Sequence, residues 1–106
     1  MVSKILKNVQ RRLIKHFLDT IILDKLKNAQ ALSGYDIMEL VHKKFGLLIS
    51  SGTVYALLYS MERKGLIRGE LTGGKRIYVL SDKGIDTINT ILKSKEEIQR
   101  FIGNLF

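Results

Sequence analysis

The segment 50–81 holds a group of short hydroxyl and basic side chains whose chemistry suits contact with nucleic acid. Hydroxyls hydrogen-bond phosphate oxygens and base edges, while lysine and arginine pair with the phosphate charge. The backbone amides at the start of a helix can also hold a phosphate, because the helix dipole favours an anion there. The side chains that could make these contacts belong to Ser51, Thr53, Lys75 and Arg76.

These candidates must be positioned by a helix and a hairpin that follow each other directly. Ser50 or Ser51 can cap a helix that Gly65 ends, and the apolar residues between them recur at three- and four-residue spacing. Those expected to face a core are Val54, Leu57, Leu58 and Met61. Two extended runs, 66–72 and 75–80, then flank a pair of glycines that suits a tight hairpin turn. A helix that leads into such a hairpin is typical of a winged helix.

The opposite face of this helix has short side chains and is almost free of acid. It carries Ser51, Thr53, Ala56, Tyr59, Ser60 and Arg63, with Tyr55 at its boundary. Such a face can approach DNA closely, because it lacks the carboxylates that the phosphate charge would repel. An ordinary solvated helix face is the alternative interpretation.

Two helical patterns precede this segment. Residues 3–28 carry an apolar stripe between lysines and arginines, and we expect its second half to pack in the domain and its first half on another surface. A second helix is expected from Ser33, which can cap it with Asp36 three residues on, to Gly46. The few residues between Gly46 and Ser50 allow only the tight connection of a helix-turn-helix.

A last helix, capped by Ser81, is expected to reach nearly to the C-terminus. Its apolar residues follow steps of three and four, as the a and d positions of a heptad do, with Lys95 as the polar exception. This apolar face is wider than one small domain needs, which predicts a homodimer. Packing against the chain's own first helix is the alternative. The residues expected at the dimer interface are Leu6, Val9, Leu13, Ile91, Ile98, Phe101, Ile102 and Leu105.

The expected fold class is therefore α+β and mostly α. It combines a winged helix-turn-helix of three helices and a two-stranded wing, over residues 1–80, with a long dimerisation helix over 81–106 in one compact unit. A chain of 106 residues with 45% apolar residues has material for one modest core.

Composition argues against several functional classes. Cysteine is absent, so no disulfide or thiolate metal site can form. The two histidines, His16 and His42, have no paired carboxylate beside them in sequence, so we expect no enzyme, no metal site and no cofactor. Asp19 and Asp24 interrupt the apolar stretch 17–26, which argues against a signal peptide or membrane span and predicts a soluble, cytoplasmic protein.

Positive charge is concentrated in two parts of the chain. The 18 basic and 10 acidic residues give a formal net charge of +8. Residues 1–28 contribute +5 and residues 50–84 contribute +3, whereas 29–49 and 85–106 are neutral. Charge placed on the first helix and on the helix and hairpin is the distribution expected of a protein that lies along phosphates.

Four motifs resemble the PadR family of winged-helix transcriptional regulators in order and spacing. They are S-G-Y-D-I at 33–37, S-G-T-V-Y at 51–55, M-E-R-K-G-L-I at 61–67 and R-I-Y-V-L-S at 76–81, with Gly84 following. The resemblance covers about residues 10–92, and the single C-terminal helix is similar to the short subfamily. Two departures bear on base preference: Ser51 stands where many members have proline, and Tyr59 and Ser60 stand where many have arginine.

The resemblance implies a homodimer joined through its first and last helices, which binds a pseudo-palindromic operator in double-stranded DNA and acts as a repressor. Residue by residue, it implies DNA contacts by Tyr35, Ser51, Gly52, Thr53, Tyr55, Lys75 and Arg76. Tyr35 and Tyr55 could equally be packing residues.

Some members of the family respond to phenolic acids or flat hydrophobic drugs held at the dimer interface. This implies a possible small hydrophobic effector near Phe17, Ile98 and Phe101, although a dry, filled interface explains the same residues. Two other functions fit a basic winged helix: a protein-interaction module, and a non-specific architectural DNA-binding protein.

Overall fold

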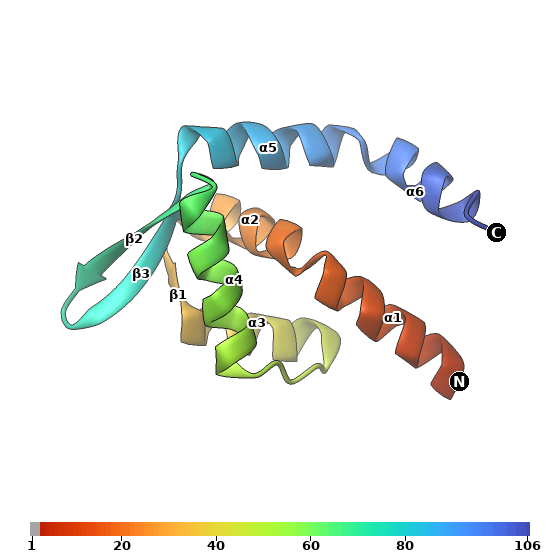
Figure 1. Cartoon of the computed structure of the whole chain (residues 1–106), viewed down its shortest axis with the longest axis horizontal. Coiled ribbons are helices and arrows are strands. Elements are labelled where there is room, and N and C mark those ends of the chain that lie inside the picture. The colour runs from red at the N-terminus through yellow and green to blue at the C-terminus, as the bar shows by residue number, and fades with distance from the viewer. Residues whose placement is uncertain (1–2) are drawn as a thin grey trace.

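The computed structural model describes residues 3–106 (Figure 1). Met1 and Val2, the first residues of the predicted domain 1–80, lie outside the described residues. The elements in chain order are α1 (Lys4–His16), α2 (Leu18–Ala29), β1 (Leu32–Ser33), α3 (Gly34–Phe45), α4 (Ser51–Arg63), β2 (Ile67–Thr72), β3 (Lys75–Leu80), α5 (Asp82–Lys93) and α6 (Lys95–Gly103). The predicted fold class, mostly helical α+β with a winged helix-turn-helix, is confirmed.

Helix α3 begins and ends at the predicted residues for local reasons. The Ser33 side chain accepts the Asp36 amide at 3.1 Å, and the Asp36 carboxylate accepts the Ser33 amide at 2.9 Å, which completes a capping box. Gly46 ends the helix in the left-handed conformation, with φ 66°. The connection to α4 then runs only from 47 to 50.

Helix α4 is capped by Ser50, whose side chain accepts the Thr53 amide at 3.2 Å. Val54, Leu58 and Met61 are buried as predicted, and Leu57 packs against the core while remaining partly exposed. One face of α4 is therefore held by the core, so the opposite face is available at the surface.

The core that α4 joins contains buried side chains from α2, α3 and α5. Helix α2 lies against α5 and α4 (Figure 1), and contributes Leu18, Ile22, Leu23 and Leu26. Helix α5 adds Ile88, which is fully buried. The second half of the N-terminal helical region thus packs in the domain, as the sequence predicts.

The wing is part of a three-stranded antiparallel sheet with strand order β1-β3-β2. Strands β2 and β3 match the two predicted runs closely, and Gly73 and Gly74 turn between them at positive φ. The short strand β1 is absent from the sequence prediction. It pairs Leu32 with Tyr78 and Ser33 with Ile77, so the wing is joined at its base to the start of α3.

The wing is also joined to α4 through Glu62. The Glu62 carboxylate accepts two hydrogen bonds from the Arg76 guanidinium at 2.9 Å and one from the Gly69 amide at 3.2 Å. Arg76 also lies over the Tyr78 ring, with 5.7 Å from its guanidinium carbon to the ring centroid. Because a Cβ on residue 69 would come within 2.6 Å of the Arg76 guanidinium, Gly69 leaves the space in which that side chain lies.

The first and last helical patterns are each divided, which corrects the prediction of one long helix over 3–28 and another from 82 nearly to the C-terminus. Phe17 separates α1 from α2, and Ser94 separates α5 from α6; both have φ −101° and ψ 14°. The Ser94 hydroxyl donates to the Thr90 carbonyl at 2.9 Å, a bond that tends to bend helices. No glycine or proline marks either bend, and the apolar periodicity continues through both, so the pattern alone predicted continuous helices.

Gly84 is fixed by a close approach between α5 and the start of β2. A Cβ on residue 84 would lie 2.1 Å from the Leu66 carbonyl oxygen, and the Ser81 amide donates to that same oxygen at 3.1 Å.

We therefore expect Gly84→Ala to lower the free energy of unfolding by about 1–3 kcal/mol through overpacking against backbone. Urea denaturation measures this. Gly103→Ala is the control, because its added Cβ meets nothing within 4 Å; equal stabilities of the two variants would contradict the close contact.

Loss of the Glu62 carboxylate should loosen the wing without unfolding the domain. In Glu62→Ala the Gly69 amide loses its acceptor, so its hydrogen exchange should accelerate, while global stability falls by about 1 kcal/mol or less, as for a partly exposed ion pair. Glu39→Ala is the control, because it removes the Lys43 ion pair on α3 and leaves the wing unaltered. Exchange at Gly69 that is the same in both variants would show that Glu62 does not hold β2.

Candidate DNA interface

The N-terminus of α4 is an exposed group of hydroxyls and amides. Ser51, Gly52 and Thr53 are all exposed, and nothing lies within 4 Å of a Cβ built on Gly52. The Ser50 and Thr53 hydroxyls lie 2.8 Å apart, and this second hydrogen bond, beside the capping bond, orients the Thr53 side chain. Together with the positive end of the helix dipole, this is a surface on which an anion can bind close to backbone.

Further along α4 the exposed face contains no carboxylate that points outward. Arg63 lies over the Tyr59 ring at 5.1 Å, and Ala56 adds little bulk between them and the N-terminus. Glu62 is the acid of this helix, and its side chain is directed to the wing, where it pairs with Arg76. The exposed face of α4, which the sequence predicts to be nearly free of acid, therefore carries no outward-directed carboxylate in the structure.

The two tyrosines predicted at the DNA have different surroundings. Tyr35, in the first turn of α3, is 64% exposed. Tyr55, at 43%, packs on α3, because a Cβ on Gly34 would come 2.6 Å from its ring. Tyr55 thus links the two helices of the helix-turn-helix, while Tyr35 has most of its surface available.

The two basic residues beside the wing tip point to opposite sides of β3, as successive strand residues do. Arg76 is directed inward to Glu62 and Tyr78, and its hydrogen bond with Glu62 raises its pKa. Lys75 is exposed. The pKa of Asp36 is lowered, chiefly by the Ser33 backbone hydrogen bond, and the charge of Lys75 contributes.

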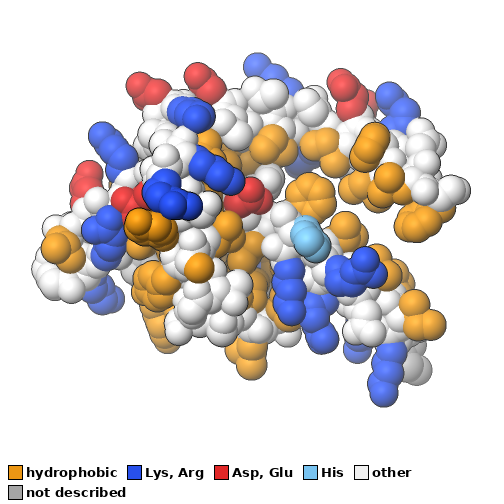
Figure 2. All heavy atoms as spheres, in the orientation of Figure 1, with side chains coloured by type: hydrophobic (Ala, Val, Ile, Leu, Met, Phe, Trp, Pro, Cys, Tyr) orange, Lys and Arg blue, Asp and Glu red, His pale blue; other side chains and the backbone are white. Residues whose placement is uncertain are grey.

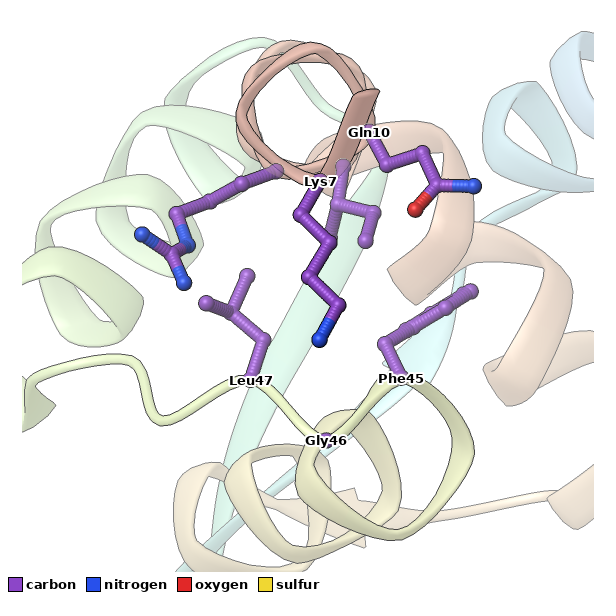
Figure 3. A pocket seen from close by; sticks show the side chains of 7 residues that line it. Lys7, Gln10, Phe45, Gly46 and Leu47 are labelled. Atoms are coloured by element: carbon purple, nitrogen blue, oxygen red, sulfur yellow. The ribbon is translucent and has the colours of Figure 1, made fainter. Parts of the chain in front are cut away.

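A second group of cations, which the residue predictions missed, lies on α1. Figure 3 shows Lys7 reaching from α1 toward the turn between α3 and α4, where Phe45, Gly46 and Leu47 lie. Arg11 lines the same hollow of about 290 Å³. Lys15 lines an adjacent hollow with Ser50 and Thr53, at the start of α4. Their spacing of four and the +5 charge of residues 1–28 were the signals available in the sequence.

The apolar surface predicted for dimerisation forms a groove of about 910 Å³ between α1 and α6. Of the eight predicted interface residues, those that line it are Val9, Leu13, Ile98, Phe101, Ile102 and Leu105. Phe101 and Leu105 are 69% and 61% exposed. Leu6 is exposed on α1 outside the groove lining, and Ile91 packs against the domain core. Phe17 lines the same groove as Ile98 and Phe101.

Within residues 3–106 no three His, Asp or Glu side chains lie close enough to hold a metal ion. His16 lines the apolar groove and His42 is exposed on α3. No helix of the described range has the length and apolar character needed to cross a membrane.

Comparison with known proteins agrees with this geometry. The model of the transcriptional regulator PadR-like family matches residues 22–90, well over half of the chain. A PadR-like transcriptional regulator from Bacillus cereus is 26% identical, with a TM-score of 0.75 over 89% of this chain and 95% of that one. A transcriptional regulator from Clostridium thermocellum is 22% identical, with a TM-score of 0.74 over 99% of this chain and 98% of that one.

Bacillus subtilis PadR, solved in complex with operator DNA, is 27% identical, with a TM-score of 0.59 over 71% of this chain and 46% of that one. No curated protein sequence matches. The family model, the winged-helix fold and the exposed N-terminus of α4 agree, and the chain belongs to the PadR-like family of transcriptional regulators.

Proposed function

We propose that this regulator is a homodimeric repressor that binds a pseudo-palindromic operator in double-stranded DNA. The observation that carries the proposal is the acid-free, hydroxyl-bearing N-terminus of α4, together with the exposed basic residue Lys75 on the wing. Bacillus subtilis PadR, at 27% identity, was solved with operator DNA, which supports the same kind of ligand here. Such a protein acts where the DNA is, which places it in the cytoplasm.

In this proposal α4 enters the major groove by its N-terminus, as the second helix of a helix-turn-helix does. The amides of Gly52 and Thr53 hold a phosphate, with Ser51 beside them. Thr53 reads a base edge through its hydroxyl, which Ser50 orients. Tyr35 contacts backbone from α3, and Tyr55 does so at the edge of its packing on Gly34.

The wing has one cation for DNA in this proposal. Lys75 is exposed and reaches a phosphate or the minor groove. Arg76 was predicted to share this role, but its guanidinium has Glu62 as an acceptor and Tyr78 as a packing surface. We assign Arg76 to holding the wing against α4, which aims Lys75.

The second copy of the chain covers the groove between α1 and α6. Six of the eight predicted interface residues line this groove, and α1 and α6 have no fully buried residue of their own. Phe101 and Leu105 are exposed apolar side chains that line this one groove, and a contiguous apolar surface of this kind marks an interaction site. A two-fold dimer of this kind places two α4 helices on two half-sites about one helical turn apart, which is roughly 34 Å. The division into a 1–80 winged helix and an 81–106 dimerisation unit remains part of the proposal.

A hydrophobic effector fits the same interface. If the second copy leaves part of the groove unfilled, Phe17, Ile98 and Phe101 would line a space of the apolar kind that binds small molecules. A ligand there would change DNA affinity by favouring one arrangement of the dimer. A completely packed interface would leave the regulator without such a ligand.

DNA binding should be tight, specific and sensitive to salt. We expect the purified protein to bind its own promoter with two chains per site, with an affinity that falls by about 0.9 log units per log unit of salt for each phosphate neutralised. Anisotropy titrations against promoter and scrambled duplexes measure this. Equal binding of both duplexes would indicate an architectural protein. A failure to bind either at low salt would favour a protein-interaction module.

Thr53→Ala should reduce discrimination between the operator and random DNA by on the order of 1 kcal/mol per half-site, because one base contact is lost. Lys75→Ala should instead weaken binding to both duplexes to a similar extent, since a phosphate contact carries no sequence information. Thr87→Ala is the matched control, because its hydroxyl bonds within α5 to the Lys83 carbonyl. An equal loss on specific and random DNA for Thr53→Ala would remove Thr53 as a reader.

A further inference from the structure

Helix α1 has two faces of opposite character. Val9 and Leu13 lie on the face that lines the groove with α6. Lys7, Arg11 and Lys15 are spaced four residues apart, so at 3.6 residues per turn they form one line on the other side of the helix. Figure 2 shows basic side chains gathered over the region of α1, which has no acidic residue.

This line of cations runs along the helix-turn-helix to the start of α4. Lys7 and Arg11 line a hollow with Gly46 and Leu47, in the turn that precedes α4 (Figure 3). Lys15 lines the next hollow with the cap residue Ser50 and with Thr53. The basic line therefore continues the surface that the proposed function assigns to DNA.

The three charges have no acidic partner within residues 3–106. The ion pairs in that range join Lys43 to Glu39 and Arg76 to Glu62. Like charges four residues apart destabilise a helix by a few tenths of a kcal/mol. An external polyanion would remove that repulsion along the whole line.

We infer that Lys7, Arg11 and Lys15 form a second contact surface for the DNA backbone, which binds phosphates beside the half-site that α4 reads. This inference rests on the proposed function. Eight residues of helix rise about 12 Å, a length over which one DNA strand carries three or four phosphates along its axis. The charge, the straight spacing and the continuity with α4 all suit a phosphate backbone, and they carry no base specificity.

The test is a salt titration of the double variant Arg11→Gln, Lys15→Gln against the promoter and a scrambled duplex. The matched control is Lys93→Gln, Arg100→Gln, which removes the same two charge types from exposed positions on α5 and α6. Each lost phosphate contact should reduce the slope of log affinity against log salt by about 0.9, hence by about 2 per protomer and about 4 per dimer. The ratio of promoter to scrambled affinity should stay unchanged. The control should keep the wild-type slope.

The outcomes separate this inference from the proposed function. If the double variant has the same slope of log affinity against log salt as its control, the inference is overturned and the proposed function is left intact. A double variant that loses discrimination along with the slope also overturns it, because the contact would then read bases. If the wild type binds neither duplex at low salt, both fail. Sedimentation of each variant, and thermal unfolding followed by circular dichroism, verify that assembly and fold are retained.

Discussion

Burial of one face of α4 is the constraint on which the rest of the structure depends. Val54 and Leu58 are completely inaccessible, in a core cluster to which α2, α3 and α5 also contribute buried side chains. On a helix of 3.6 residues per turn, burying those two side chains in the core also fixes the direction in which Thr53 points. Burial of each such side chain stabilises the fold by roughly 1.5–3 kcal/mol, so rotation of α4 about its axis is costly. The surface that meets a ligand is thus set by residues that never touch it.

Features with local causes could be predicted from the sequence. Ser33 and Asp36 satisfy each other's amides within four residues, so the start of α3 needs no tertiary information. The ends of the wing strands follow from the glycine pair between them. The core face of α4 follows from spacing alone. These features cover most of the helix-turn-helix and the wing.

Features decided by long-range contacts could not be predicted. Strand β1 has two residues, too few for a period of two, and it forms because Tyr78 lies beside Leu32. The inward direction of Arg76 depends on Glu62, fourteen residues earlier, and on the absence of a side chain at Gly69. The bends at Phe17 and Ser94 interrupt patterns that read as continuous helix. For β1 and Arg76 a partner distant in sequence decides between conformations that the local residues both allow. At Phe17 and Ser94 the apolar period is unbroken, so it does not mark the end of either helix.

Because α1 is joined to α2 at the bend at Phe17, a rotation at that residue would move the whole of α1 as one rigid helix. The helix extends 13 residues from that point, about 20 Å at 1.5 Å per residue. A rotation of about 10° at its base would therefore move its far end by about 3 Å, more than the tolerance of a hydrogen bond. Val9 and Arg11 are carried on this one rigid rod, the first turned to the groove and the second to the helix-turn-helix. A change in the width of the groove between α1 and α6 would therefore also change the distance between the opposite side of α1 and α4.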